Sequence, residues 1–175
     1  STPAPMESAQ ALALAPFQWR HLSRPTFYVP LLALTLASLA PRTAEAYVYA
    51  PDASITRDEL AAGIVLQYEM VAIGEEAFFR GVLNNSLSHA FGETWGLATS
   101  SVVFGLSHEG QGNQATPLSA TVFGLYAGYL HQRNAYELGE SVALHYWWNV
   151  LSALNLLRAR EARRPVPILA LRLRF

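Results

Sequence analysis

The residues best suited to catalysis are two adjacent carboxylates inside an otherwise apolar stretch that begins near Leu60. The segment reads Gly74-Glu-Glu-Ala-Phe-Phe-Arg-Gly81. On a helix, Glu76 and Arg80 share one face, with the acid N-terminal to the base, which is the favourable order for an ion pair. Glu75 is rotated by about 100° from Glu76. We therefore predict that Arg80 neutralises Glu76, whereas Glu75 points elsewhere and stays available for chemistry.

Two further patterns place polar side chains four residues apart in apolar stretches. One reads Phe104-Gly-Leu-Ser-His108 and the other reads His145-Tyr-Trp-Trp-Asn149. On a helix this spacing puts both residues on one face, about 6 Å apart. Phe104 can then form an apolar floor beside the His108 ring, and His145 and Asn149 can present two hydrogen-bond donors to one small volume. A buried acid beside buried imidazoles is typical of a water-activating centre.

The elements that carry these patterns are predicted to be apolar helices. Charged residues make up only 14% of the 175-residue chain, whereas about 25% is usual in soluble proteins. A capping pattern at Thr56 starts the longest helix, and Gly92 marks its end. We predict an all-α fold, a polytopic transmembrane bundle of about five to six apolar helices. The five clearest stretches are Pro25–Pro41, about 57–90, Trp95–His108, Leu118–His131 and Ser141–Leu157.

The chain divides into three predicted regions. Residues 1–24 form a lead-in that we expect to be poorly ordered, residues 25–157 form the helical membrane domain, and residues 158–175 form an Arg-rich tail. The arginines after Leu157 favour a cytoplasmic C-terminal flank. A net charge of −1 does not suggest nucleic-acid binding, and the absence of cysteine excludes disulfides and thiolate metal sites.

Three further polar residues are assigned no catalytic role. His89 and His131 lie near predicted helix ends beside polar residues. We therefore expect them at the membrane–water interface rather than in the catalytic site. Glu69 lies two turns before Glu76, and we expect it to be structural or to line a cavity.

In this order, on successive apolar helices, the three patterns resemble the motifs of the CPBP family of intramembrane glutamic endopeptidases, also called the Abi or CAAX-protease family. Those motifs are Glu-Glu-x-x-x-Arg, Phe-x-x-x-His and His-x-x-x-Asn/Asp, and all three are present without substitution. The resemblance covers about residues 58–157, the expected catalytic core. It implies a peptidase of the bacterial inner membrane that needs no metal or other cofactor. Its partners would be the lipid bilayer and a membrane-associated protein or peptide substrate, not nucleic acid.

The resemblance also implies a role for each residue of the motifs. Glu75 would be the general base, and His108 would orient and activate the attacking water. His145 and Asn149 would stabilise the oxyanion of the tetrahedral intermediate. The supporting residues would be Glu76, Arg80 and Phe104.

Two other functions fit the same residues. A zinc-dependent membrane protease would bind the metal through Glu75, His108 and His145, with Glu76 as the base. This hypothesis is weakened because the chain has no His-Glu-x-x-His pair and because Arg80 is poorly placed beside a dication. A non-catalytic membrane binding or immunity module would use its buried polar groups only to hold helices together.

Overall fold

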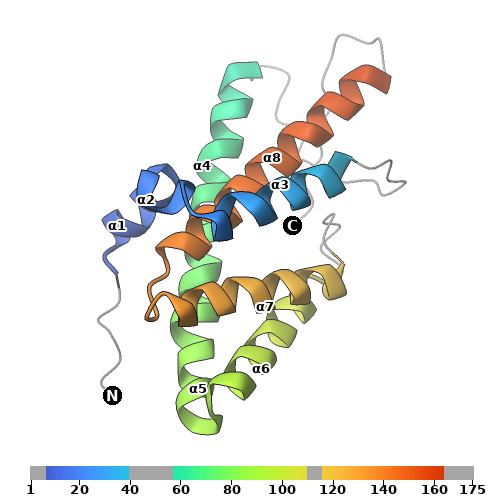
Figure 1. Ribbon diagram of the computed structural model, residues 1–175. Coiled ribbons are helices and arrows are strands. Elements are labelled where there is room, and N and C mark those ends of the chain that lie inside the picture. Colours follow the sequence, from blue (N-terminus) through green and yellow to red (C-terminus); the bar gives the residue numbers. More distant parts are fainter. Residues whose placement is uncertain (1–6, 40–56, 110–115, 164–175) are drawn as a thin grey trace.

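The structure, a computed structural model, describes residues 7–39, 57–109 and 116–163, with side chains within residues 7–36, 61–109 and 116–154. This described part consists of helices and connecting turns without a strand, which confirms the all-α class. The helical elements are α1 (Ala9–Leu14), η1 (Ala15–Phe17), α2 (Trp19–Leu22), α3 (Pro25–Leu39), α4 (Arg57–Glu76), η2 (Ala77–Asn84), α5 (Asn85–Phe91), α6 (Glu93–Leu106), α7 (Pro117–Arg133) and α8 (Gly139–Arg163) (Figure 1).

The predicted helical stretches correspond to α3, to the continuous segment α4–η2–α5, and to α6, α7 and α8. Thr56 and the Gly-rich residues 110–115 lie outside the described residues. Within the part of the chain that the structure describes, no helix combines the length and the apolar character needed to cross a membrane.

Local sequence explains where α5, α6 and α7 end or begin. Gly92 adopts φ 92° between α5 and α6, a backbone conformation that only glycine reaches without strain. The predicted helix end at this glycine is confirmed. Thr116 caps α7, because its Oγ1 accepts a hydrogen bond from the Ser119 amide at 3.2 Å, and Pro117 follows at the first helical position.

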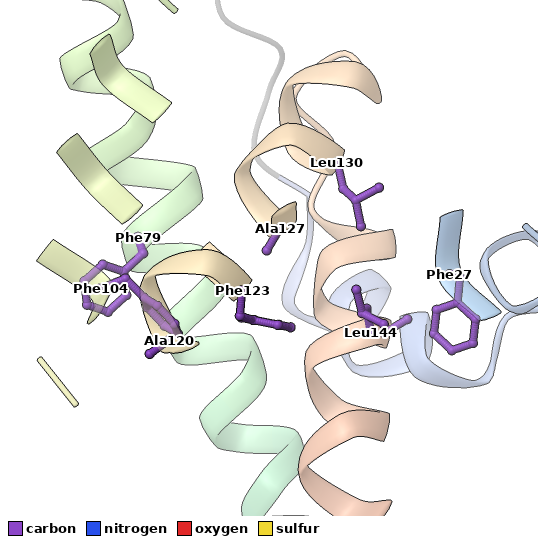
Figure 2. Close-up of a cluster of buried hydrophobic side chains, with 9 residues drawn as sticks. Phe27, Phe79, Phe104, Ala120, Phe123, Ala127, Leu130 and Leu144 are labelled. Atoms are coloured by element: carbon purple, nitrogen blue, oxygen red, sulfur yellow. The ribbon is translucent and has the colours of Figure 1, made fainter. Parts of the chain in front are cut away.

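The main core is a set of aromatic and aliphatic side chains contributed by five different elements (Figure 2). Phe79 of η2 packs edge-on against Phe104 of α6, with ring centres 5.0 Å apart. Phe104 in turn lies 6.1 Å from Phe123 of α7. Leu144 of α8 and Phe27 of α3 complete the cluster. This core fixes the helices that carry the three sequence patterns relative to one another.

The N-terminal segment packs onto α8. The Trp147 indole donates a hydrogen bond to the Pro16 carbonyl at 2.7 Å, and the Phe17 ring lies edge-on to Tyr146 at 5.7 Å. Residues 9–22 are thus largely helical, which differs from the poorly ordered lead-in expected for residues 1–24. The difference arises because tertiary contacts with α8 stabilise helices that are too short to be stable alone.

His21 is buried where this segment meets the start of α8. Neither ring nitrogen has a hydrogen-bond partner among the described residues, and Nε2 would lie 2.6 Å from a Cβ added to Gly139. Burial, reinforced by Arg20 and then Arg24, lowers the pKa of His21 from 6.5 to about 4. His21 is therefore uncharged in the folded protein at neutral pH.

This depressed pKa predicts an acid-dependent loss of stability. Between pH 6.5 and about 4, His21 is protonated in the unfolded chain but not in the folded chain. The free energy of unfolding therefore falls as the pH is lowered through this range. His21→Phe should flatten this decline in thermal unfolding measured across that range. His89→Phe, at an exposed position, should leave it unchanged. An unaltered slope in His21→Phe would contradict this origin of the pH dependence.

Close contact between α6 and α7 yields a second stability prediction. A Cβ added to Gly105 would lie 2.5 Å from the Pro117 carbonyl oxygen, so Gly105→Ala must push the two helices apart. We expect the free energy of unfolding to fall by about 1–3 kcal/mol, measured by denaturation in detergent micelles. Gly63→Ala is the matched control, because a Cβ there meets nothing within 4 Å and should stabilise α4 by about 0.5–1 kcal/mol. Equal stability of the two variants would contradict the tight packing.

Candidate active site

Glu75 and Glu76 are the last two residues of α4, where the chain continues directly into the π-helix η2. The π-helix η2 spans eight residues, and π-helical geometry is rare and frequently found at functional sites. Arg80 lies in η2, and its Nη1 is 3.0 Å from Glu76 Oε1. Both side chains are almost fully buried. The ion pair predicted from the i,i+4 spacing is therefore present.

Arg80 also connects η2 to the two neighbouring helices. Its Nη2 donates to the Gly124 carbonyl of α7 at 3.2 Å. Its guanidinium carbon lies 4.4 Å from the centre of the Phe104 ring of α6, which is a cation–π distance. The Arg80 guanidinium that neutralises Glu76 is thus also held by contacts with α6 and α7.

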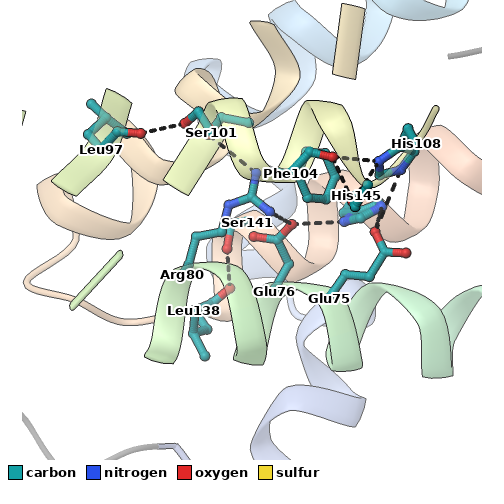
Figure 3. A network of polar contacts seen from close by, with 12 residues as sticks. Glu75, Glu76, Arg80, Leu97, Ser101, Phe104, His108, Leu138, Ser141 and His145 are labelled. Carbon is teal, nitrogen blue, oxygen red and sulfur yellow. Dashed lines mark hydrogen bonds and ion pairs between the residues drawn. The ribbon is translucent and has the colours of Figure 1, made fainter. Parts of the chain in front are cut away.

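Glu76 has a second partner that sequence spacing did not predict. Its Oε1 lies 2.8 Å from Nδ1 of His145, on α8 (Figure 3). The two residues are 69 positions apart in the chain, and no local pattern indicates that they meet. The same carboxylate oxygen therefore joins η2 and α8 to the end of α4.

Glu75 points toward both histidines of the sequence patterns. Its Oε2 is 3.7 Å from His145 Nε2 and 3.9 Å from His108 Nε2 (Figure 3). The side chain is 32% exposed, but Oε2 itself is buried and has no hydrogen-bond partner among the described residues. One carboxylate oxygen and two imidazole nitrogens thus face a single small volume.

The rings of both histidines are fixed by neighbours on α6 and α7. His108 Nδ1 lies 2.8 Å from the Phe104 carbonyl, and the Phe104 and His108 ring centres are 4.5 Å apart. Phe104 therefore supports His108 as expected. The Phe123 ring packs edge-on against His145 at 5.0 Å.

Asn149 is less closely tied to this centre. It lies one turn after His145 on α8 and is half-buried. Among the described residues, no hydrogen bond or ion pair connects its side chain to Glu75, to either histidine or to any other group. Its predicted part in the site stays a prediction.

The metal alternative has little geometric support. Within the described residues, no group of three or more histidine, cysteine, aspartate or glutamate side chains is arranged so that it could hold a metal ion. Arg80, beside Glu76, adds a positive charge close to the centre where a dication would bind.

Comparison with known proteins agrees with the motifs. The family model described as type II CAAX prenyl endopeptidase Rce1-like matches residues 57–151, which is more than half of the chain. This chain belongs to the Rce1-like family. The matched segment contains every residue of the three sequence patterns, and the predicted membership of the CAAX-protease family is confirmed. Neither the curated proteins nor the solved structures include a significant match.

The Rce1-like match does not cover the N-terminal segment and α3, which are joined to α8 by a separate polar cluster. Arg24 donates to Glu140 Oε2 at 2.6 Å and to Asn134 Oδ1 at 2.9 Å. Thr26 donates to the other Glu140 oxygen at 2.5 Å. Sequence reasoning did not identify this cluster, which fixes the start of α8 ahead of His145.

A third polar cluster corrects the expectation for His131. The ring is fully buried, and its Nε2 lies 3.0 Å from the Asn85 side-chain oxygen, so His131 connects α7 to α5 and is not interfacial. Beside it, Tyr136 donates to Glu93 at 2.7 Å. Burial, followed by the Glu93 carboxylate, raises the pKa of Tyr136 to about 12.

The buried ion pair of this Rce1-like chain gives a testable prediction. Arg80→Met would leave Glu76 buried without its cation, and we expect the free energy of unfolding to fall by about 3–5 kcal/mol. The double variant Glu76→Gln/Arg80→Met should recover part of this loss, because no charge then remains buried. Denaturation in detergent micelles measures both, with the exposed Arg133→Met as the control within about 0.5 kcal/mol of the parent. A double variant less stable than Arg80→Met would contradict the prediction.

Proposed function

We propose that the chain is an intramembrane endopeptidase that hydrolyses a peptide bond of a membrane-associated protein or peptide with water activated by Glu75. The observation that supports this most directly is the convergence of Glu75 Oε2 with the Nε2 atoms of His145 and His108, at 3.7 and 3.9 Å. The Rce1-like family is a protease family, so a hydrolytic centre built on its matched segment is consistent with membership.

The proposed chemistry uses the chain's own side chains and no metal. A water held among Glu75, His108 and His145 loses a proton to the Glu75 carboxylate and attacks the scissile carbonyl carbon. A positioned base of this kind contributes about 10²–10⁴-fold to the rate. His145 and Asn149 lie on the same helix face and would stabilise the oxyanion, at about 10²–10³-fold for one donor. Glu76 and Arg80 hold the centre in place.

The partly exposed Glu75 side chain supports its assignment as the base. Glu75 is 32% exposed, whereas Glu76 is fully buried and paired. Only Glu75 can therefore receive a proton from a substrate-side water without breaking an internal ion pair.

A location in the membrane is proposed from the outer surface of the helices. Large apolar side chains are exposed on α3, α6 and α7, where water would solvate them poorly. Examples are Leu32, Leu36, Trp95, Leu106, Leu118 and Val122, each more than half exposed. These surfaces suit acyl chains. The arginines after Leu157 favour an orientation in the bacterial inner membrane with the C-terminal flank in the cytoplasm.

The family description suggests the substrate to try first. Rce1-like proteins are described as CAAX prenyl endopeptidases, so a prenylated peptide ending in Cys-a-a-X is a suitable probe. A lipid anchor would hold such a peptide at the bilayer, where a site among apolar helices is reached by lateral diffusion.

Replacement of the proposed base tests the function. Glu75→Gln keeps the size of the side chain but cannot accept the proton, so we expect kcat for the prenylated probe to fall by about 10²–10⁴-fold. The matched control is Glu137→Gln, an exposed carboxylate at the α7–α8 turn, which should keep full activity. Cleavage in detergent micelles or vesicles, followed by mass spectrometry, measures both.

The same assay separates the alternatives. Full activity of a folded Glu75→Gln would overturn the proposal. Activity that is lost on chelation and restored by zinc would favour the metalloprotease. A parent protein that binds the probe without cleaving it would favour a binding module.

A further inference from the structure

The hydrogen-bond partners of the two histidines determine where each neutral ring carries its hydrogen. His108 Nδ1 lies 2.8 Å from the Phe104 backbone carbonyl, and a carbonyl oxygen can only accept. The hydrogen of neutral His108 is therefore on Nδ1. Its Nε2, which faces Glu75 at 3.9 Å, presents a lone pair.

The same reasoning applies to His145. Its Nδ1 lies 2.8 Å from Glu76 Oε1, and that oxygen is also 3.0 Å from Arg80 Nη1. A carboxylate paired with a buried guanidinium is ionised and can only accept. Neutral His145 thus donates Nδ1–H to Glu76 and presents a lone pair at Nε2, 3.7 Å from Glu75 Oε2.

With both histidines neutral, the two imidazole nitrogens that face Glu75 Oε2 are acceptors and not donors. Three acceptor atoms converge, one from Glu75 and one from each histidine, and the buried Glu75 Oε2 accepts from no described residue. In its neutral form His145 cannot donate to an oxyanion. It can do so only after its Nε2 has taken up a proton.

The surroundings of the two rings differ in a way that decides which one takes the proton. His145 Nδ1 contacts the Glu76 carboxylate, whereas His108 Nδ1 contacts only neutral groups among the described residues, the Phe104 carbonyl at 2.8 Å and the Ser107 hydroxyl at 3.3 Å. A negative charge at Nδ1 stabilises an imidazolium far better than a carbonyl dipole does. The Phe123 and Phe104 rings also pack against the His145 ring, and Glu75 Oε2 lies 3.7 Å from its Nε2.

Resting on the proposed function, we infer that His145 is the proton carrier of the reaction and that Glu76 is the positioning residue that makes it so. Glu75 takes a proton from the attacking water and passes it to His145 Nε2 as the water oxygen bonds to the carbonyl carbon. The imidazolium Nε2–H then donates to the oxyanion. When the C–N bond breaks, that proton moves to the leaving amine, and His145 returns to its neutral form.

A comparison of amide and ester bonds tests this role. Protonation of the leaving group matters greatly for an amine and little for an alkoxide, whereas an oxyanion donor assists both. His145→Gln keeps a donor for the oxyanion but cannot carry a proton. With the prenylated Cys-a-a-X probe, we expect kcat to fall by about 10²–10⁴-fold for the amide and by about tenfold or less for the matching depsipeptide ester. Equal losses for amide and ester would overturn the inference.

A measurement that needs no substrate tests the inference separately. The ring nitrogens of the 175-residue chain, labelled with ¹⁵N-histidine in detergent micelles, report where each hydrogen resides. The His145→Gln sample identifies the signal of His145. We expect Nδ1–H in the parent. A hydrogen on Nε2 of neutral His145 would overturn the inference even if the peptidase is real. If the unmodified protein cleaves neither the amide nor the ester probe, the proposed function is overturned. The ring-nitrogen measurement then still shows whether the hydrogen of neutral His145 is on Nδ1.

Discussion

The structure depends on one buried carboxylate. Glu76 has no exposed surface, and an ion there is tolerated only when charge and hydrogen bonds compensate for the lost water. Arg80 and His145 supply both through the same oxygen. Because those two partners lie on η2 and α8, the rotation of α4 about its axis is fixed, and Glu75 is fixed with it. The carboxylate that we propose as the base is therefore positioned by its neighbour.

In each of the two histidines, the fold holds one ring nitrogen and leaves the other facing Glu75. The Phe104 ring packs against the His108 ring, and the Phe104 carbonyl contacts His108 Nδ1. The Phe123 ring packs against His145. In both rings Nδ1 is used by the fold and Nε2 faces Glu75. The core that holds the helices together thus also sets the direction in which the imidazoles can act.

Sequence spacing predicted what lies within one helix and not what lies between helices. The ion pair of Glu76 with Arg80 follows from i,i+4 geometry, but the bond to His145 depends on how α8 packs against α4, which no local pattern encodes. The helices within residues 9–22 were not expected because each of them is too short to be stable on its own. Their order comes from apolar contacts such as Phe17 on Tyr146. His131 was misplaced for the same reason, since its partner Asn85 lies on another helix.

Two adjacent carboxylates can do different work because one helical step changes their surroundings completely. A rotation of about 100° takes the side chain from the sealed position of Glu76, with no exposure, to the edge position of Glu75, with 32%. A sealed carboxylate with two fixed partners keeps its charge through a reaction cycle and can stabilise a cation formed beside it. An edge carboxylate with an unused oxygen can gain and lose a proton. In the proposed mechanism, Glu76 therefore stays ionised while Glu75 exchanges protons, and this difference follows from their adjacent positions on one helical turn.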